Sequence, residues 1–371
     1  MWQGRELILC ALALWAGNWL GDALPLSPFL YLSLSMVLAI VAFRRPTGLW
    51  LLLSLALVGA AAVQVGRMPP VAGPSAVGVW ASGRKAAFAS WLGELLPLGD
   101  ELAVLQALAI GEKGGLTHDL RAAYRESGAM HLLALSGLHV GLLYALLRTL
   151  LSPLGGYRAA RLLRSGLLLA SLWTYALITG LSASISRAVL MITFYEISGF
   201  LSGDRDSLTA LAGSAVCLLL VDPEVPRDIG FQLSYTAVLS ILLFHPWLRS
   251  RMHTRSRLLQ KVWELLSVSL CCQATCGVLA WVYFGSFPRY FMLTTLLAIP
   301  LTTAVMYAIA AAVASAGLSS LVVRFLPVMG IPSFSDWLSS VLMSLSDFAV
   351  HLLTRLLHLL NTVIQLIASL G

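Results

Sequence analysis

The side chains best able to do chemistry gather in residues 131–141, which read HLLALSGLHVG. Ser136 and His139 are three residues apart, so on a helix the two side chains would share one face. Gly137 and Gly141 form a small-x-x-x-small pair, a spacing that lets the backbone of another helix approach closely. On such a face, Ser136 and His139 would serve as hydrogen-bonding groups between helices.

A serine close to a histidine is also the pattern of a nucleophile with its base. An intramembrane hydrolase is therefore an alternative function. It is the weaker one, because both residues would sit on one helix and the chain has no second glycine-rich serine motif. Full function in the Ser136→Ala variant would count against an intramembrane hydrolase.

A second motif places an arginine just inside an apolar run. Arg187 is preceded by Ser182, Ser184 and Ser186. Helix N-termini and guanidinium groups both favour phosphate, so this pattern fits a helix start that faces an anion. The alternative is an arginine whose head group extends toward the lipid head groups. Both interpretations stay open.

A third motif follows a turn marked by Pro223 and Pro226. Asp228 is well placed to cap the next helix, and capping alone would account for this residue. Gln232 and Ser234 then bring polar atoms into the start of an apolar run. Polar groups inside membrane spans are costly and are candidates for function by default.

Several chemistries lack their motifs in this chain. The sequence has no glycine-rich phosphate loop ending in Lys-Ser or Lys-Thr, and no string of metal-ligating residues among its seven histidines. The five cysteines lie in apolar runs, where free cysteine behaves as a small hydrophobe. We therefore expect no metal, no cofactor and no enzymatic activity.

The elements that position these motifs follow from composition. Of 371 residues, 58% are hydrophobic and 11% are charged, and the mean hydropathy is +0.85. An ordinary soluble domain has roughly 25% charged residues. Since one span needs about 20 apolar residues, we predict an all-α, polytopic transmembrane helical bundle of about 10–11 spans with interfacial amphipathic helices. A soluble enzyme, a disordered chain and a disulfide scaffold are excluded.

The apolar runs divide the chain into four segments. Residues 1–66 read as N-terminal transmembrane helices, and 131–317 as the main transmembrane domain. Residues 67–130 read as a periplasmic, interfacial segment, with an amphipathic helix near 78–96 that carries Trp80, Phe88 and Trp91 on one side. Residues 318–371 read as C-terminal membrane-associated helices. The expected spans lie near 7–20, 29–43, 49–65, 131–151, 165–181, 185–201, 207–221, 231–248, 262–284 and 291–317.

The net charge of +7 mainly orients the protein. Eleven of the 24 Lys and Arg residues lie in the clusters 44–45, 148–164 and 249–261. Because cytoplasmic loops are enriched in these residues, the clusters predict a cytoplasmic N-terminus and place 67–130 outside. Arg121, Arg125 and Arg187 remain as basic groups on the outer side.

At this level the sequence resembles a known family. Residues 129–144 look like the hallmark of the ComEC-type competence proteins, the membrane channel for DNA in natural transformation. Four further blocks resemble other family motifs in the family's order. The five blocks are 109–128, 129–144, 182–188, 222–234 and 266–287.

The resemblance implies a channel in the bacterial inner membrane that passes single-stranded DNA into the cytoplasm. It makes 131–317 the channel domain, and implies as partners single-stranded DNA, the lipid bilayer, a periplasmic DNA receptor, a cytoplasmic helicase or single-strand-binding protein, and a second copy in a homo-oligomer. Candidate residues for the channel and the DNA path are His131, Ser136, Gly137, His139, Gly141, Arg187, Asp228, Gln232, Arg121 and Arg125.

The chain departs from the family's full-length pattern in two ways. Many members carry a β-rich module before the hallmark and a metallo-β-lactamase-like domain after the membrane region. We expect the membrane competence domain alone, so nuclease activity is not carried over. A transporter or flippase of an anionic lipid or solute, built on the same scaffold, is the alternative function.

Overall fold

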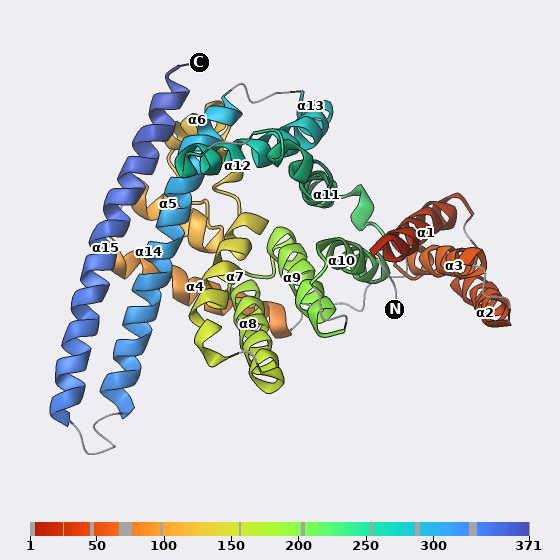
Figure 1. Cartoon of the computed structure of the whole chain (residues 1–371), viewed down its shortest axis with the longest axis horizontal. Helices are drawn as coiled ribbons and strands as arrows, with labels where there is room; N and C mark the ends of the chain where they lie inside the picture. Colours follow the sequence, from red (N-terminus) through yellow and green to blue (C-terminus); the bar gives the residue numbers. More distant parts are fainter. Residues whose placement is uncertain are drawn as a thin grey trace. The chain divides into compact units, whose positions relative to one another are not determined.

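Helices account for all the regular structure that is described in this chain (Figure 1). The computed structural model describes residues 4–24, 26–44, 48–66, 76–96, 99–155, 157–201, 205–252, 255–285, 290–325 and 332–370. Within these ranges there is no β-strand. Together with the apolar spans below, this confirms the predicted all-α membrane fold.

The chain forms two compact units, each assembled from separate stretches of sequence. The first unit comprises Met1–Ala76, Ala183–His253 and Cys271–Val282. The second unit comprises Val77–Ser182, Thr254–Leu270 and Tyr283–Gly371.

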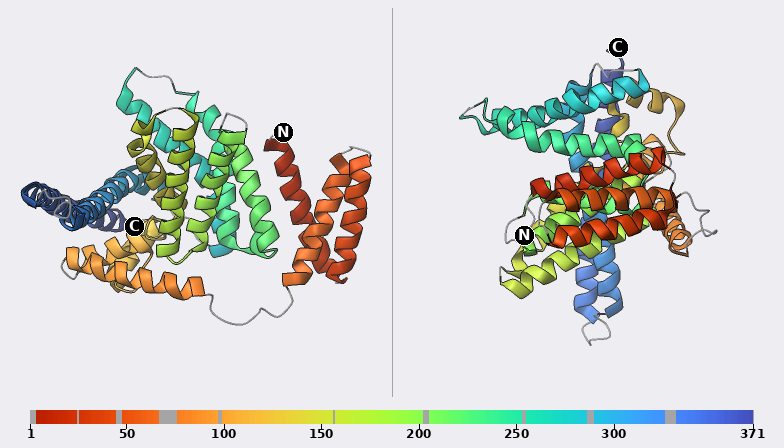
Figure 2. Two further views of the ribbon diagram at one scale, coloured as in Figure 1. Left: turned by 90° about the horizontal axis from the view of Figure 1, so that it is seen from below. Right: turned by 90° about the vertical axis from the view of Figure 1, so that its right-hand side faces the viewer.

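The first unit is built on close packing of the N-terminal helices, which lie side by side (Figure 2). Gly21 of α1 faces Ala60 of α3, and a Cβ on this glycine would lie 2.7 Å from the Ala60 carbonyl oxygen. Gly17 faces Ala56 in the same way, so Gly17 and Gly21 form a small-x-x-x-small contact that the sequence analysis missed. The helical elements of this unit are α1 (Gly4–Ala23), α2 (Pro28–Arg44), α3 (Gly48–Gly66), α9 (Ala183–Leu201), α10 (Ser207–Val221), η3 (Val225–Arg227), α11 (Ile229–Arg249), the π-helix η4 (Gln273–Gly277) and most of α13 (Val278–Phe284).

The second unit has its core between a long helical hairpin and several short helices. Helices α14 and α15 pack along each other (Figure 1), and α15 also contacts α5 and α6. Leu105 and Leu108 of α5 and Leu353 and Leu357 of α15 are fully buried there. The elements are α4 (Ala76–Leu95), α5 (Asp100–Ile110), α6 (His118–Glu126), η1 (Ala129–His131), α7 (Gly137–Leu150), η2 (Ser152–Leu154), α8 (Arg158–Ile178), α12 (Arg257–Cys272), α14 (Phe291–Phe325) and α15 (Pro332–Ala368).

Four described helical runs are long and apolar enough to cross a membrane. Three shorter apolar helices accompany them. The expected total of about 10–11 spans stays a prediction. The four runs are Ile229–Arg249, Arg257–Phe284, Phe291–Arg324 and Ser333–Ala368, and the shorter helices are Leu52–Gln64, Gly137–Leu150 and Ser207–Val221.

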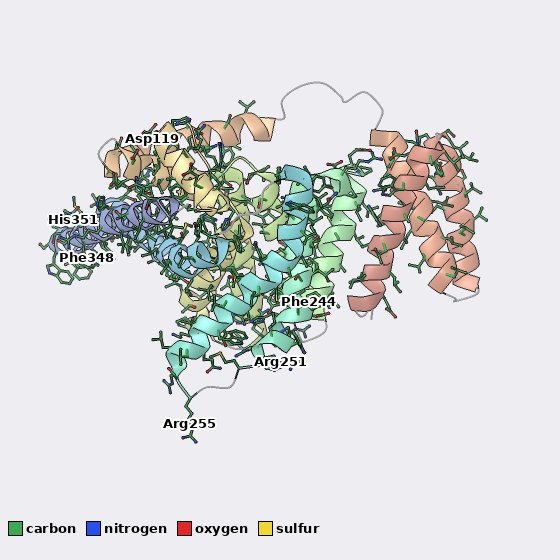
Figure 3. All side chains as sticks on the ribbon, turned by 90° about the horizontal axis from the view of Figure 1, so that it is seen from above. Asp119, Phe244, Arg251, Arg255, Phe348 and His351 are labelled. Atoms are coloured by element: carbon green, nitrogen blue, oxygen red, sulfur yellow. The ribbon has the colours of Figure 1, made fainter. Side chains whose placement is uncertain are left out.

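Helices occur in the interfacial segment and in the C-terminal segment, where the sequence predicted helices. In α4, Phe88 and Trp91 stack with ring centroids 5.5 Å apart against the core, whereas Trp80 is 49% exposed, so Trp80 does not share their buried side. In α15, Phe348 and His351 are exposed and point away from the hairpin (Figure 3). The described helix is long and apolar enough to cross a membrane over Ser333–Ala368, and its membrane association stays a prediction.

Some residues of the basic clusters and of the segment 67–130 lie outside the residues that the structure describes. Arg45, residues 67–75 and residues 253–254 lie outside the described residues, and the side chain of Arg44 is likewise not described. Arg251 and Arg255, from the third basic cluster, are exposed (Figure 3). The division into four segments and the orientation in the membrane stay predictions.

Candidate functional site

An ion pair joins two of the sequence-predicted residues in the first unit. Nη1 of Arg187, in the second turn of α9, donates to Oδ2 of Asp228 at 2.9 Å. Arg187 is only 6% exposed, whereas the Asp228 side chain is 49% exposed. The arginine therefore does not extend toward the lipid head groups, which was one of its two interpretations.

Asp228 has a second task in the same position. It is the N-cap of α11, and its carboxylate accepts hydrogen bonds from the backbone N–H groups of Gly230 at 3.2 Å and Phe231 at 2.9 Å. The predicted cap is confirmed. The interpretation that capping alone accounts for Asp228 is wrong, because the same carboxylate also fixes the Arg187 guanidinium.

Gly230 makes room for this arrangement, although it was not among the predicted site residues. A Cβ at this position would lie 3.0 Å from Nη2 of Arg187 and 3.2 Å from Oδ2 of Asp228. Only a residue without a side chain lets the guanidinium approach the first turn of α11 so closely. We refer to Arg187, Asp228 and Gly230 as the arginine cluster.

The arginine cluster has spare capacity to bind an anion. A guanidinium carries five N–H donors. Nη1 is engaged by Asp228, while the buried Nε has no hydrogen-bond partner among the described residues. Guanidinium groups match phosphate and carboxylate oxygens geometrically. The arrangement can therefore hold a negatively charged oxygen beside the start of α9.

Helix α1 anchors the turn that carries Asp228. Nδ2 of Asn18 donates to the carbonyl oxygen of Pro223 at 3.0 Å. Arg227 pairs with Asp22 and also lies over the Trp19 ring, 5.3 Å from its centroid. Sequence reasoning missed these contacts, because residues about 205 positions apart carry no local pattern that links them.

Gln232 serves the same turn. Its Nε2 donates to the carbonyl oxygen of Pro226 at 2.8 Å, one turn into α11. Gln232 and Tyr235 also line an otherwise mainly apolar cavity of about 400 Å³ against α1 and α10. The Tyr235 hydroxyl donates to Oγ of Ser214 at 2.9 Å, which joins α11 to α10.

A π-helix lies beside α11. Residues Gln273–Gly277 adopt this wider helix, and Sγ of Cys276 contacts the carbonyl oxygen of Leu233 at 3.3 Å. Single π-turns are rare and are frequent at functional sites. The apolar pattern of the sequence gives no sign of this irregularity.

In the second unit, the hallmark segment is not one continuous helix. The predicted span 131–151 is wrong at its start, because α7 begins only at Gly137, with Ser136 as its N-cap. A short 3₁₀ turn ends at His131, and the residues between are not helical. Leu132 and Leu133 are nevertheless 1% and 0% exposed, so this non-helical stretch is buried in protein.

Ser136 and His139 meet through capping rather than on a helix face. The backbone N–H of Ser136 donates to Nδ1 of His139 at 3.3 Å, and Oγ of Ser136 lies 3.0 Å from the same nitrogen. Because Nδ1 of His139 accepts a hydrogen bond, the neutral ring carries its proton on Nε2. Nε2 is buried and has no partner in the described part of the chain.

This geometry supplies only part of a catalytic dyad. A base that activates serine is normally oriented through its second nitrogen by a carboxylate or a carbonyl. Nε2 of His139 has no such group among the described residues. The contact therefore fits an N-cap better than a nucleophile and base.

The other predicted residues of this unit lie around the same segment. Nδ1 of His131 lies 2.9 Å from the Gly128 carbonyl oxygen, and its ring centroid lies 5.5 Å from that of Phe291. Gly137 and Gly141 are exposed, and a Cβ on Gly141 would meet no described atom within 4 Å. The expectation that a helix packs closely on this pair is thus not met at Gly141.

Arg121 and Arg125 share the exposed face of α6. Leu120 and Tyr124 form the buried face of the same short helix, and the Tyr124 hydroxyl donates to Oδ1 of Asn361 in α15 at 2.9 Å. Nη2 of Arg121 donates to the Lys113 carbonyl oxygen at 3.0 Å. Both arginines can therefore meet a polyanion from solvent.

The structure thus gathers the predicted residues into two groups. Arg187, Asp228 and Gln232 belong to the first unit. The seven others belong to the second unit: Arg121, Arg125, His131, Ser136, Gly137, His139 and Gly141. In the described residues, no three His, Cys, Asp or Glu side chains are grouped as metal ligands would be.

Comparison with known proteins places both groups in one matched region. Residues 108–370 match the family described as Competence protein. ComE operon protein 3 of Bacillus subtilis (strain 168) is 37% identical over 154 residues, which cover 42% of this chain and 19% of that protein. Competence protein ComA of Neisseria gonorrhoeae is 30% identical over 161 residues, which cover 39% of this chain and 22% of that protein.

Recombination protein 2 of Haemophilus influenzae (strain ATCC 51907 / DSM 11121 / KW20 / Rd) is 27% identical over 148 residues, covering 38% of this chain and 18% of that protein. The aligned regions span only about a fifth of the length of these curated relatives. No solved structure matches the chain.

Proposed function

Because the chain belongs to the competence protein family, we propose that it forms a channel in the bacterial inner membrane. This channel passes single-stranded DNA into the cytoplasm during natural transformation. One relative is named a competence protein, and another is named a recombination protein. These names agree with DNA as the cargo.

The observation that carries this proposal is the buried guanidinium of Arg187. Nucleic-acid binding is dominated by phosphate, so a channel for DNA needs donors along its path. Arg187 is 6% exposed, held by Asp228, and has a free N–H donor at Nε. A fixed arginine of this kind can contact successive phosphates of a passing strand without reading the bases.

The start of α7 supports the same function. With 14 residues this helix is about 21 Å long, less than the roughly 30 Å of a hydrocarbon core. It is preceded by buried, non-helical backbone. Broken helices whose N-termini face anionic groups line substrate paths in membrane transporters. Arg121 and Arg125 would attract the strand on the outer side.

The proposal includes an orientation and partners. The N-terminus lies in the cytoplasm, and residues 67–130 lie on the periplasmic side. A periplasmic receptor delivers the DNA, and a cytoplasmic helicase or single-strand-binding protein takes it up, with a homo-oligomer as an assembly to test. The chain itself performs no catalysis.

Two measurements test the proposal. Deletion of the gene in a transformable host should abolish DNA uptake, and undiminished transformation would contradict it. The purified chain should also bind a single-stranded oligonucleotide with an affinity that falls as salt rises. A transporter of an anionic lipid or solute has no reason to show this binding, so its absence would favour that alternative.

A further inference from the structure

An apolar cavity in the second unit has no part in the proposed DNA path. It has a volume of about 570 Å³ and lies between α7, α8 and α14. Leu150, Leu167 and Tyr307 line it and are 64%, 44% and 41% exposed, so the cavity is open along one side. It is therefore a groove on the surface of the unit.

The groove has a defined length. Its lining extends over Leu142–Leu150 on α7 and Leu167–Ile178 on α8. At 1.5 Å per residue these stretches are about 12 Å and about 17 Å long. One leaflet of a bilayer core is about 15 Å thick, which is half of the whole. The groove thus matches one extended acyl chain.

One end of the groove is closed by short helices. Phe88 of α4 and Ala109 of α5 line this end. The Tyr175 hydroxyl donates to the Ala109 carbonyl oxygen at 3.2 Å, which fixes the C-terminal half of α8 there. An acyl chain would end against this wall.

The other end of the groove is basic. Arg164 lies three residues before Leu167, on the same face of α8, and Arg161 lies one turn further out. Neither arginine forms an ion pair within the described residues. At 100° per residue, Arg164, Arg161 and Arg158 lie about 60°, 120° and 180° around α8 from Leu167, so Arg158 is the arginine on the face opposite the groove.

We propose that this groove binds one anionic phospholipid of the inner leaflet. An acyl chain fills the apolar groove, and the head-group phosphate binds Arg164 and Arg161. Burial of an acyl chain contributes about 0.8 kcal/mol per CH₂ in either place, since the bilayer is also apolar, so the apolar groove alone gives no preference. The preference comes from the two guanidinium groups, which favour a lipid of net negative charge over a zwitterionic one.

The lipid site can be tested independently of the proposed DNA path. The purified full-length chain is stripped of lipid in detergent and offered equal amounts of phosphatidylglycerol and phosphatidylcholine. Native mass spectrometry then counts the lipids bound per chain. Wild-type protein should retain phosphatidylglycerol about tenfold more than phosphatidylcholine, a ratio that corresponds to one charge-assisted contact. This comparison of the two lipids contains no DNA, so its result does not depend on the proposed channel.

Matched variants locate the site. Arg164→Gln should lower retention of phosphatidylglycerol to the level of phosphatidylcholine, whereas Arg158→Gln should leave the preference intact. Ala170→Trp on α8 and Ala310→Phe on α14 fill the groove from two sides and should reduce retention of both lipids. Unfolding temperature and size-exclusion profile identify which of these two variants is folded, and either one suffices.

Three results would overturn the proposal. The first is equal retention of the two lipids by wild type. The second is an unchanged preference in Arg164→Gln. The third is displacement of phosphatidylglycerol by a single-stranded oligonucleotide, which would assign Arg161 and Arg164 to nucleic acid instead.

Discussion

Nη1 of Arg187 lies 2.9 Å from Oδ2 of Asp228, although 41 positions separate the two residues. The same carboxylate caps α11, so the start of that helix and the direction of the guanidinium are set by one side chain. Gly230 leaves the space that the guanidinium occupies. Substitutions at Asp228 and Gly230 can therefore test the stability of α11 and the position of the Arg187 guanidinium separately.

Asp228→Asn should keep the cap and lose the ion pair. Asparagine is as good an N-cap as aspartate. Removing one partner of a fully buried pair costs roughly 3–5 kcal/mol, and because the Asp228 side chain is 49% exposed we expect only about 1–2 kcal/mol. Thermal unfolding in detergent measures this. Asp228→Ala should lose about 1 kcal/mol more, since it also removes the cap. Wild-type stability in Asp228→Asn would show that the ion pair contributes nothing.

Gly230→Ala should disturb function more than stability. Alanine favours the helix, but its Cβ would lie 3.0 Å from Nη2 of Arg187, so the guanidinium must shift. We expect DNA uptake to fall about two- to fivefold, equivalent to roughly 0.5–1 kcal/mol. Gly317→Ala in α14 is the matched control, because a Cβ there meets no described atom within 4 Å. Equal uptake by both variants would argue against a role for the tight approach.

Much of the helical layout followed from apolar runs and turn residues. The predicted span 207–221 coincides with α10, and the predicted span 231–248 lies within α11 by two residues at one end and one at the other. Long apolar runs bounded by Asp206 and Asp228 leave little choice, because both aspartates cap the helix that follows. Local sequence determines such boundaries.

The features that were missed depend on distant contacts. The segment before Gly137 is as apolar as a helix, yet it is not helical, because Ser136 caps α7 through its contact with His139. The anchoring of the Pro223 turn by Asn18 needs the packing of α1 on α10 to be known first. The apolar periodicity of the sequence predicts neither the break before Gly137 nor the anchoring of the turn, because both depend on contacts between residues that the apolar pattern does not encode.

Ser136→Ala tests capping against catalysis. Loss of an N-cap costs about 1 kcal/mol, so this variant should melt earlier in detergent but support nearly normal DNA uptake. Ser136→Asn should restore the melting temperature, because asparagine also caps, although it provides no nucleophile. If uptake were abolished by both substitutions while the protein stayed folded in the membrane, Ser136 would have a chemical role.

Because of Asp206, the folded state should lose stability as the pH falls. Burial raises the pKa of Asp206, but hydrogen bonds from the Thr209 hydroxyl and from the N–H groups of Leu208 and Thr209 outweigh this and lower the pKa below its ordinary value. The stabilisation is therefore present above the unfolded pKa of about 3.9 and is lost as pH falls through the lower folded value.

Asp206→Asn keeps a capping oxygen but does not titrate, so its melting temperature should fall less than that of the wild type between about pH 5 and pH 2. Thermal unfolding across this range measures the difference. Identical acid profiles for the two proteins would mean that the Asp206 cap does not contribute to acid sensitivity.

The most direct test of the proposed channel is import of labelled donor DNA by a transformable strain that depends on this chain. Arg187→Ala removes the buried phosphate contact, and Arg158→Ala removes an exposed arginine elsewhere as the matched control. With equal amounts of each protein in the membrane, we expect about tenfold less nuclease-protected label in the cytoplasm for Arg187→Ala and wild-type import for Arg158→Ala. Wild-type import by Arg187→Ala would contradict the account.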